Sequence, residues 1–366
     1  MIVFISPFSQ AGASTSRLIH LAEAFGPGKM LLLPKTDKYG GSEDRDWFVF
    51  PLERKSFALL PLWWIRACAT LFRLRPAAVV FLKPHLFTLP PALLWGFLTG
   101  RPLVFDCDEW DPATLVDNDE PAWKVKLTEW LARKGFDAAT LIVYGNHLTL
   151  EEKIPEEYRK KTLYVPNGAD TGVFKPGSDA HDGFNVMYAG MLFKIKHIMP
   201  LVDAIDRARG KVPGLRCTVV GGGDRLEELK SIVAKRGLAP YFTFTGMVGH
   251  DRLPEILKAA DVLIAPFEDL KGIRYQSNVK VFEYMACGKP VVASRVGELD
   301  KVLSGGAGLI VRPGDPEALA NAIAAINADK AAAEAIGAKA RDKVMDEYDW
   351  RVLGKRFKER IDNITR

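Results

Sequence analysis

The sequence predicts an α/β protein with two doubly wound, Rossmann-like domains that face each other across a cleft. Short runs rich in Val, Ile and Phe alternate with longer helical patterns along the chain, which is typical of parallel sheets covered by helices. A chain of 366 residues exceeds the usual size of one compact domain. The polar, turn-rich stretch 175–183 interrupts the alternation. Because ligands of such sheets bind beyond the carboxyl ends of the strands, two facing domains imply a shared cleft.

The expected elements fall into two series on either side of that stretch. In the first series we expect strands at Ile2–Ser6, Ala78–Leu82, Leu103–Asp106, Thr140–Tyr144 and Leu163–Val165, and helices at Ser14–Phe25, Leu60–Leu74 and Ala122–Lys134. In the second we expect strands at Asn185–Ala189, Arg216–Val220, Tyr241–Thr245, Val262–Ala265 and Pro290–Ala293, and a helix near Pro316–Asn327. The last helix, Trp350–Ile364, has apolar residues at helical spacing and therefore one buried face. We expect domains over residues 1–177 and 178–345, and a C-terminal helix within 346–366 that packs on the first domain.

The composition is that of an ordinary globular protein, with 48% hydrophobic and 26% charged residues. The net charge of +5 is mildly basic, and no nucleic-acid-binding module is recognisable. The four cysteines form no C-x-x-C pair, so we expect neither a zinc site nor disulfides, and a reducing cytoplasm fits best. The start of the chain resembles a buried strand rather than a signal peptide. No stretch has the roughly 18 uninterrupted apolar residues of a membrane-spanning helix.

The segment Ser277–Ser294 is the strongest local signal for a ligand site. Ser277 is expected to cap a helix that ends near Gly288 and is followed by a strand. The N-terminus of such a helix offers free N–H groups and a positive dipole to a phosphate. Glu283 shares a helix face with Lys280 and can accept hydrogen bonds from two hydroxyl groups, such as a ribose diol. The alternative interpretation is a solvated glutamate on an ordinary helix.

Two further segments follow predicted strands. After Tyr188, Gly190 is followed by Lys194 and Lys196, whose charges suit a diphosphate, although solvated loop lysines are the simpler interpretation. The cluster Gly221–Gly223 only superficially resembles a dinucleotide fingerprint, because Leu226 stands where G-x-G-x-x-G has its third glycine. A dinucleotide-dependent dehydrogenase is therefore disfavoured.

Taken together, these segments resemble the retaining glycosyltransferases of family 4, which have the GT-B fold. The resemblance covers nearly the whole chain and is carried by Val165–Pro176, Tyr188-Ala-Gly190, Val219-Val-Gly-Gly-Gly223, Phe244-Thr-Gly-Met-Val248, Ala260–Pro266 and Glu283-Tyr-Met-Ala-Cys-Gly-Lys-Pro-Val-Val292. It implies an N-terminal domain that binds the acceptor and a C-terminal domain that binds a nucleotide sugar.

The resemblance also implies roles for individual residues. Glu283 matches the second glutamate of the family's E-x7-E motif, which holds the ribose. The positions expected to bind the rest of the donor are Gly12, Gly190, Lys194, Lys196, Gly221, Gly223, Met247, Val248, Asn278, Val279 and Lys280. Among these, Lys196 is expected to neutralise the diphosphate and to act in catalysis, whereas Gly246, Met247 and Val248 match the stretch that reads the base.

Three positions depart from the family pattern. Tyr275 stands where E-x7-E has its first glutamate, and Met191 replaces the arginine that accompanies the lysine, so that Lys194 or Arg274 is left to take its role. Asp108 aligns with the histidine expected after the third strand. We expect Asp108 to be catalytic, touching the acceptor hydroxyl or the donor sugar at the floor of the cleft.

The acidic segment Asp106–Glu120 contains no Lys or Arg, and its spacing also suggests a metal site. The GT-B resemblance argues against a metal, because lysines and a helix N-terminus neutralise the diphosphate in that fold. We expect no metal and no cofactor besides the nucleotide-sugar co-substrate. A solvated acidic loop is the simpler interpretation of Asp117–Glu120.

Residues 50–105 are basic and rich in tryptophan. Seven basic side chains oppose Glu53, namely Arg54, Lys55, Arg66, Arg73, Arg75, Lys83 and Arg101. Together with Trp63 and Trp64 they suit the surface of an anionic membrane. The alternative is a helix packed on the sheet with a solvated basic edge.

The resulting functional hypothesis is a retaining glycosyltransferase that moves a sugar from a nucleotide-diphosphate sugar to a hydroxyl acceptor. A UDP-sugar is the favoured donor and a GDP-sugar is the alternative. The acceptor is expected to be a lipid-linked or cell-surface glycan precursor, and the enzyme to lie on the inner face of the cell membrane. The alternatives are an inactive membrane-associated scaffold of the same fold and a sugar-nucleotide epimerase or phosphorylase.

Overall fold

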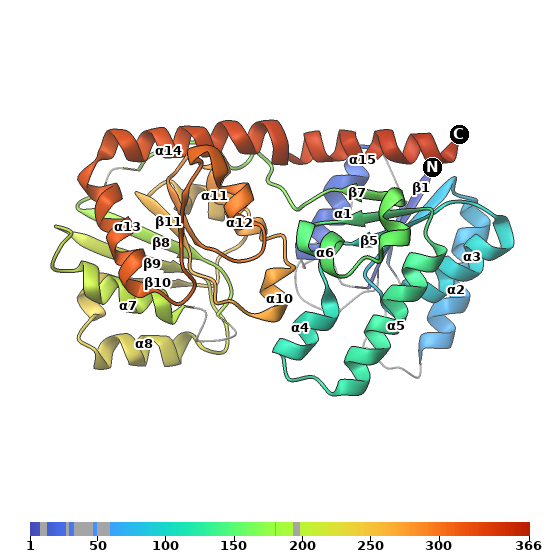
Figure 1. Ribbon diagram of the computed structural model, residues 1–366, viewed down its shortest axis with the longest axis horizontal. Coiled ribbons are helices and arrows are strands. Elements are labelled where there is room, and N and C mark those ends of the chain that lie inside the picture. Colours follow the sequence, from blue (N-terminus) through green and yellow to red (C-terminus); the bar gives the residue numbers. More distant parts are fainter. Residues whose placement is uncertain (8–12, 27–28, 33–46, 50–58, 180, 193–197) are drawn as a thin grey trace. The chain divides into compact units, whose positions relative to one another are not determined.

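Two parallel β-sheets form the framework of the protein, one in each of two structural units (Figure 1). A computed structural model describes residues 1–366 apart from 8–12, 27–28, 33–46, 50–58, 180 and 193–197. The N-terminal unit contains Met1–Asn167, Tyr275–Ser277 and Trp350–Arg366, and the C-terminal unit contains Gly168–Arg274 and Asn278–Asp349. The predicted pair of parallel-sheet α/β domains is confirmed, whereas the cleft shared by them stays a prediction.

The N-terminal sheet has the strand order β3-β2-β1-β4-β5-β6-β7. Its strands are β1 (Ile2–Ser6), β2 (Lys29–Leu32), β3 (Trp47–Val49), β4 (Ala78–Leu82), β5 (Leu103–Cys107), β6 (Leu141–Tyr144) and β7 (Thr162–Tyr164). Its helices are α1 (Ala13–Glu23), α2 (Leu60–Leu74), α3 (Leu89–Thr99), α4 (Asp111–Asp117), α5 (Ala122–Ala138), α6 (His147–Glu152) and α15 (Trp350–Thr365). The order reverses between β1 and β4, which is where doubly wound sheets bind their ligands.

Both faces of this sheet are buried because successive side chains of a strand point to opposite faces. Val3 and Ile5 of β1 lie in a core with the buried sides of α2, α3 and α5. Phe4, between them, lies in a second core with α1 and α15. In that second core the ring of Phe357 in α15 packs edge-on against Phe25 at 5.8 Å between centroids. The last helix therefore completes the N-terminal unit.

The C-terminal sheet has the strand order β10-β9-β8-β11-β12-β13. Its strands are β8 (Phe184–Ala189), β9 (Leu215–Val220), β10 (Phe242–Gly246), β11 (Val262–Ala265), β12 (Val291–Ser294) and β13 (Leu309–Val311). Its helices are α7 (Met199–Ala208), α8 (Leu226–Lys235), α9 (Leu253–Leu257), α10 (Lys271–Arg274), α11 (Val279–Ala286), α12 (Leu299–Val302), α13 (Pro316–Ala328) and α14 (Lys330–Lys343). Helices α7, α8 and α13 cover one face, whereas α9, α11, α12 and α14 cover the other.

The C-terminal unit begins at Gly168, earlier than the expected break after residue 177. Ala169 forms a parallel bridge with Asp349, whose carboxylate accepts a hydrogen bond from the Thr171 hydroxyl at 2.5 Å. The guanidinium of Arg341 donates to the carbonyls of Thr171 and Phe174. These contacts attach the segment before the turn-rich stretch to the C-terminal unit.

Every strand expected from the sequence is present, with each end within one residue of its expected position. The sequence did not predict β2, β3, β13 or α3. Helix α3 was obscured by Pro90 and Pro91, which occupy its first turn, where proline is tolerated because the N–H groups have no helical partner. Among the described residues no helix is both long and apolar enough to cross a membrane.

Candidate functional site

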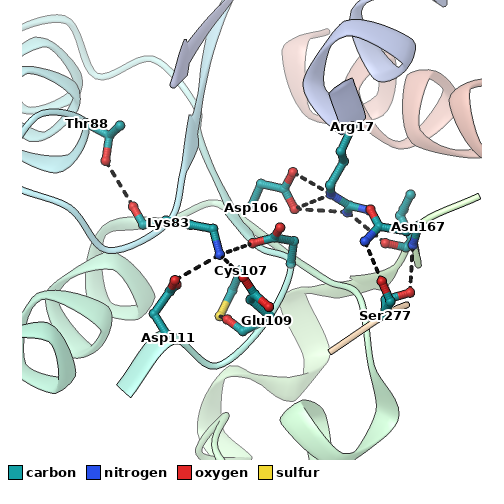
Figure 2. Close-up of polar contacts among 11 residues, drawn as sticks. Arg17, Lys83, Thr88, Asp106, Cys107, Glu109, Asp111, Asn167 and Ser277 are labelled. Carbon is teal, nitrogen blue, oxygen red and sulfur yellow. Dashed lines mark hydrogen bonds and ion pairs between the residues drawn. The ribbon is translucent and has the colours of Figure 1, made fainter. Parts of the chain in front are cut away.

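A cluster of buried charges lies at the carboxyl ends of β4 and β5 (Figure 2). The guanidinium of Arg17, from α1, is fully buried and pairs with Asp106 through its Nε and Nη2 atoms at 2.9 and 3.0 Å. Its other donors reach the carbonyls of Val165 and Pro166 and the side chain of Asn167. This ion pair therefore fixes α1 and the end of β5 to the segment after β7.

Asp108, the catalytic residue expected from the sequence, lies two residues beyond Asp106 and is 3% exposed. Its Oδ1 atom lies 3.2 Å from the ammonium of Lys83, which follows β4. The same ammonium contacts Glu109 at 2.5 Å and Asp111 at 2.9 Å. Lys83 therefore takes the place among these carboxylates that a metal cation would need. The independence of the reaction from metal stays a prediction.

The charges of this cluster alter the pKa values of its members. Burial lowers the pKa of Lys83, but the carboxylates of Asp108, Asp111 and Glu109 oppose this and raise it well above its ordinary value. Burial raises the pKa of Asp111 to about 7, with Lys83 opposing the rise and Glu109 adding to it.

In the C-terminal unit, the candidate phosphate site is the start of α11. Ser277 is not the cap that the sequence predicts, because the N-cap is Asn278 and its side chain makes no capping hydrogen bond. The hydroxyl of Ser277 accepts from the backbone N–H of Asn167 at 2.9 Å, and its carbonyl accepts from the Asn167 amide at 2.7 Å. Ser277 is thus occupied within the N-terminal unit.

Two predicted donor residues on α11, Lys280 and Glu283, make specific contacts. The Lys280 ammonium lies 3.2 Å from the hydroxyl of Tyr188 and 4.5 Å from the centre of its ring. Glu283 is 6% exposed, and its Oε1 atom lies 2.7 Å from Nε2 of His250. This hydrogen bond raises the pKa of His250, although burial opposes it. The other carboxylate oxygen of Glu283 is left to accept from a ligand.

Predicted glycines bring the ends of β8, β9 and β10 together. Gly221 has φ 130° and Gly223 has φ 145°, a backbone region in which other residues are strained. A Cβ atom at Gly221 would clash with the carbonyl of Gly190, and one at Gly223 would lie 2.7 Å from the carbonyl of Leu192. The N–H of Gly221 donates to Gly246 at 3.0 Å. The backbones at the ends of these strands therefore lie close together, and the donor site stays a prediction.

The residues predicted to read the base follow Gly246 directly. Met247 is 56% exposed, whereas Val248 is partly buried and packs against the core below α11. An exposed methionine at the end of β10 is accessible to a ligand.

Three predicted site residues, Gly12, Lys194 and Lys196, lie outside the described residues. The departures from the family pattern are described, however. The hydroxyl of Tyr275 donates to Glu152 at 2.6 Å, and the ammonium of Lys153 lies 4.9 Å from the ring centre. Tyr275 thus has its partners in the N-terminal unit. Arg274 lies 3.5 Å from Asp269, and Met191 is 46% exposed.

Of the two tryptophans in the basic stretch, Trp63 is buried and Trp64 is partly buried, whereas the association with a membrane stays a prediction. Trp63 is 1% exposed, and its indole N–H donates to the carbonyl of Phe87 at 2.7 Å. The indole of Trp64 donates to Leu86 at the same distance. Lys83 is also buried and cannot contribute to a basic surface. The tryptophans instead join α2 to the segment before α3, and residues 50–58 lie outside the described part.

Sequence reasoning missed the roles of Lys83, Arg17 and His250. Lys83 was counted as a surface charge because a lone lysine after a strand carries no pattern. A signal was nevertheless present, since it follows one central strand and the acidic run follows the next. The carboxyl ends of adjacent parallel strands meet at one edge of the sheet.

Comparison with known proteins gives matches in sequence and in structure. Residues 183–329 match the family model described as Glycosyl transferases group 1. A GDP-mannose-dependent alpha-(1-6)-phosphatidylinositol monomannoside mannosyltransferase of Mycolicibacterium smegmatis is 30% identical over 213 residues, which are 54% of this chain and 55% of that protein. A D-inositol 3-phosphate glycosyltransferase of Acidothermus cellulolyticus is 35% identical over 178 residues, 43% of this chain and 39% of that protein. The chain thus spans about half the length, or less, of these curated relatives.

Solved structures match over almost the whole chain. Sucrose-phosphate synthase from Thermosynechococcus elongatus superposes with a TM-score of 0.78 at 21% identity and covers 98% of this chain and 97% of its own. Anabaena Alr3699/HepE in complex with UDP superposes with a TM-score of 0.75 at 19% identity and covers 99% of both chains. At these identities the likeness establishes the fold.

Proposed function

The chain belongs, through residues 183–329, to the Glycosyl transferases group 1 family, and we propose that it transfers a sugar from a nucleotide-diphosphate sugar to a hydroxyl acceptor. The observation that carries the proposal is the arrangement at α11. An uncapped helix start lies on the same short helix as Lys280 and Glu283, whose buried carboxylate is paired with His250. Phosphate oxygens and a ribose diol are the groups that such an arrangement binds.

We propose that the C-terminal unit binds the donor and that the N-terminal unit binds the acceptor. The acceptor hydroxyl attacks the anomeric carbon on the face from which the nucleotide diphosphate leaves, so that the configuration is retained. The leaving phosphate takes the proton of the hydroxyl. Lys196 and the backbone N–H groups at Asn278–Lys280 stabilise the charge on the diphosphate, while Asp108 orients the acceptor or the donor sugar.

The comparisons support two classes of donor. The Anabaena protein is in complex with UDP in its solved structure, which agrees with the UDP-sugar favoured from the sequence. The Mycolicibacterium relative, more similar in sequence, is named for GDP-mannose. We therefore propose a UDP-sugar or a GDP-sugar.

The test is a thermal-shift screen against UDP-, GDP- and ADP-sugars, followed by an assay of nucleoside diphosphate release with and without acceptor in EDTA. We expect one donor to raise Tm and its sugar to be transferred without added metal. Isomerised sugar from the donor alone would indicate an epimerase instead, and binding without turnover would indicate an inactive scaffold. Activity that EDTA abolishes and Mg²⁺ restores would contradict the metal-free mechanism.

We propose further that the acceptor is lipid-linked and that the enzyme works at the cytoplasmic face of a membrane. Although Trp63 and Trp64 are occupied, α2 and α3 expose other large apolar side chains, including Ile65 at 67%, Phe97 at 86% and Leu98 at 59%. Exposed apolar residues beside arginines suit the boundary between lipid headgroups and acyl chains. The phosphatidylinositol monomannoside in the name of the Mycolicibacterium relative also supports a lipid acceptor.

Sedimentation with liposomes tests this location. The protein is expected to bind anionic vesicles at low salt and to dissociate at high salt, and Phe97→Ser is expected to weaken binding. The matched control is Met345→Ser, which removes an exposed apolar side chain of the C-terminal unit and should leave binding unchanged. Equal recovery in the supernatant under all conditions would favour a soluble acceptor.

A further inference from the structure

Lys83 is the most unusual lysine among the described residues. It is 3% exposed, and its backbone has φ 60°, a left-handed conformation that is strained for a residue with a Cβ atom. The conformation is held by its surroundings. The N–H of Lys83 donates to the carbonyl of Asp106 at 3.0 Å, and its carbonyl accepts from the hydroxyl of Thr88 at 2.9 Å.

The side chain of Lys83 meets more negative charge than it neutralises. Figure 2 shows its ammonium directed at the segment after β5, where it contacts Asp108, Glu109 and Asp111 at 3.2, 2.5 and 2.9 Å. The neighbouring cation, Arg17, is committed to Asp106. The single ammonium of Lys83 therefore contacts three carboxylates. Oδ1 of Asp108 and Oδ2 of Asp111 are buried and accept no hydrogen bond from the part of the chain that the structure describes.

Stability alone does not account for this arrangement. Removing a lysine and several carboxylates from water carries a desolvation penalty that the ion pairs often fail to repay, and apolar residues of similar size would fill the space at no such cost. A strained backbone and incompletely paired charges are instead typical of functional sites, where the surroundings force a particular geometry. One of the three carboxylates that Lys83 contacts belongs to Asp108, the predicted catalytic residue.

We propose that Lys83 is a positioning residue of the sugar-transfer reaction, which holds Asp108 in its reactive orientation and maintains the negative charge of the segment Asp108–Asp111. The inference rests on the proposed function, in which Asp108 touches the donor sugar or the acceptor. Lys83 itself acts through the carboxylates. It determines how much negative charge the acceptor side presents near neutral pH.

The charged groups that face this cluster come from three elements. Lys83 follows β4 and Arg17 lies in α1, whereas β5 and the segment after it supply Asp106, Cys107, Asp108, Glu109 and Asp111. Burial raises the pKa of the Cys107 thiol well above its usual value, so the thiol stays neutral. Without Lys83, the pKa of Asp111 would rise further, because the ammonium that opposes its protonation would be gone while the neighbouring carboxylates remain.

The test compares the pH profiles of kcat and kcat/KM for wild type, Lys83→Met and Lys124→Met. Lys124 is a matched control, since it pairs with Glu120 on the surface of α5 in the same unit. In Lys83→Met we expect the acid limb to move to higher pH by about 1–3 units and kcat to fall more than KM rises. Lys124→Met is expected to keep the wild-type profile.

A second variant is needed in case Lys83→Met fails to fold, as a lowered Tm and an altered circular dichroism spectrum would show. The double variant Glu109→Gln, Asp111→Asn retains Lys83. Of the three carboxylates that contact the Lys83 ammonium, it keeps that of Asp108 alone. We expect this variant to move the acid limb to lower pH. A folded Lys83→Met enzyme with the wild-type limb, or a double variant with an unmoved limb, would overturn the role of Lys83. A wild-type protein that transfers no sugar would overturn the proposed function itself.

Discussion

The two candidate ligand-binding regions differ in the groups that they offer: backbone groups in the C-terminal unit and charged side chains in the N-terminal unit. At the strand ends of the C-terminal unit, glycine backbones approach one another and a helix begins without a side-chain cap. At the strand ends of the N-terminal unit, buried charged side chains pair with one another. Backbone groups are suited to a ligand part that never changes, such as a diphosphate, because their positions follow from the fold. Charged side chains can be exchanged in evolution and are suited to a part that varies.

The difference also has an energetic side. Glu283 of the C-terminal unit is paired with a histidine whose side chain is 69% exposed, whereas Asp106 of the N-terminal unit is paired with a fully buried arginine. A ligand hydroxyl can replace the first partner at little cost, since water already reaches it. No ligand hydroxyl or water reaches the buried pair of Arg17 and Asp106 in the same way. We therefore expect substitutions in the N-terminal cluster to affect stability first and substitutions in the C-terminal site to affect donor binding first.

The largest effect is expected from Arg17→Met. It leaves the carboxylate of Asp106 buried without its partner, which costs about 3–5 kcal/mol of the free energy of unfolding. Urea unfolding followed by circular dichroism measures the loss. Arg225→Met, which removes an exposed pair with Glu228, is the control and should cost less than about 1 kcal/mol. Combining Arg17→Met with Asp106→Leu should restore part of the loss. A single variant as stable as the control would contradict the distinction between the two regions.

Lys196→Ala is expected to act on the rate instead. The charge on the diphosphate grows as the sugar leaves, so an interaction that strengthens in the transition state lowers kcat more than it raises KM when removed. Removing one hydrogen-bond donor that stabilises charge in a transition state typically lowers kcat about 10²–10³-fold, and we expect a loss of this size for Lys196→Ala. Steady-state kinetics with Lys194→Ala beside it decides which lysine has the role. Wild-type turnover in Lys196→Ala would remove this residue from the mechanism.

Glu283→Gln is expected to weaken donor binding while the fold remains intact. Exchanging a carboxylate for an amide weakens a charged hydrogen bond to the ribose, worth about 1.5–3 kcal/mol. Isothermal titration with the nucleoside diphosphate and the full donor should show the same loss for both, because both carry the ribose. The matched control is Glu255→Gln, an exposed glutamate of α9 that pairs with Lys258. Unchanged donor affinity would exclude Glu283 from the site.

The sequence predicted the two parallel sheets better than the N-terminal cluster, and the reason is locality. The alternation of strands and helices is visible within short segments, and the segments around Gly221, Gly223 and Glu283 are short enough to resemble those of a known family. Arg17 and Asp106 are 89 residues apart in the chain, and neither position has a local pattern. Their pairing follows from the folding of α1 beside β5, which no window of sequence contains.

Individual differences between the structure and the sequence-based predictions also have specific causes. Ser277 precedes a helix and has the chemistry of a cap, but the N–H and the side-chain amide of Asn167 both bind it. A long-range partner thus outcompeted the local one. Trp63 and Trp64 fit an amphipathic membrane helix by composition, yet carbonyl groups at Leu86 and Phe87 accept from their indoles. Composition does not reveal which face of a helix is buried when charges lie on both sides of the tryptophans.

The smallest expected effect on stability is that of His250→Ala. Its dependence on pH tests whether the pairing in the C-terminal site is more easily replaced than the pairing in the N-terminal cluster. The hydrogen bond to Glu283 raises the pKa of His250 above its ordinary value. The contribution to stability is therefore fully present below the pKa of the unfolded state, about 6.5, and is lost as pH rises through the raised value. Because the imidazole is exposed, water screens the pair, and His250→Ala should lower stability by well under about 1 kcal/mol, more at pH 5.5 than at pH 8.5.

Protonated His250 also competes with the ribose for the Glu283 carboxylate, so donor affinity of the wild type should fall on acidification, whereas His250→Ala should lose this dependence. His181→Ala, near Asp261 in the same unit, should keep it. If donor affinity in His250→Ala still falls on acidification as in the wild type, the histidine is not a replaceable partner of Glu283, and the C-terminal site is as rigidly paired as the N-terminal one.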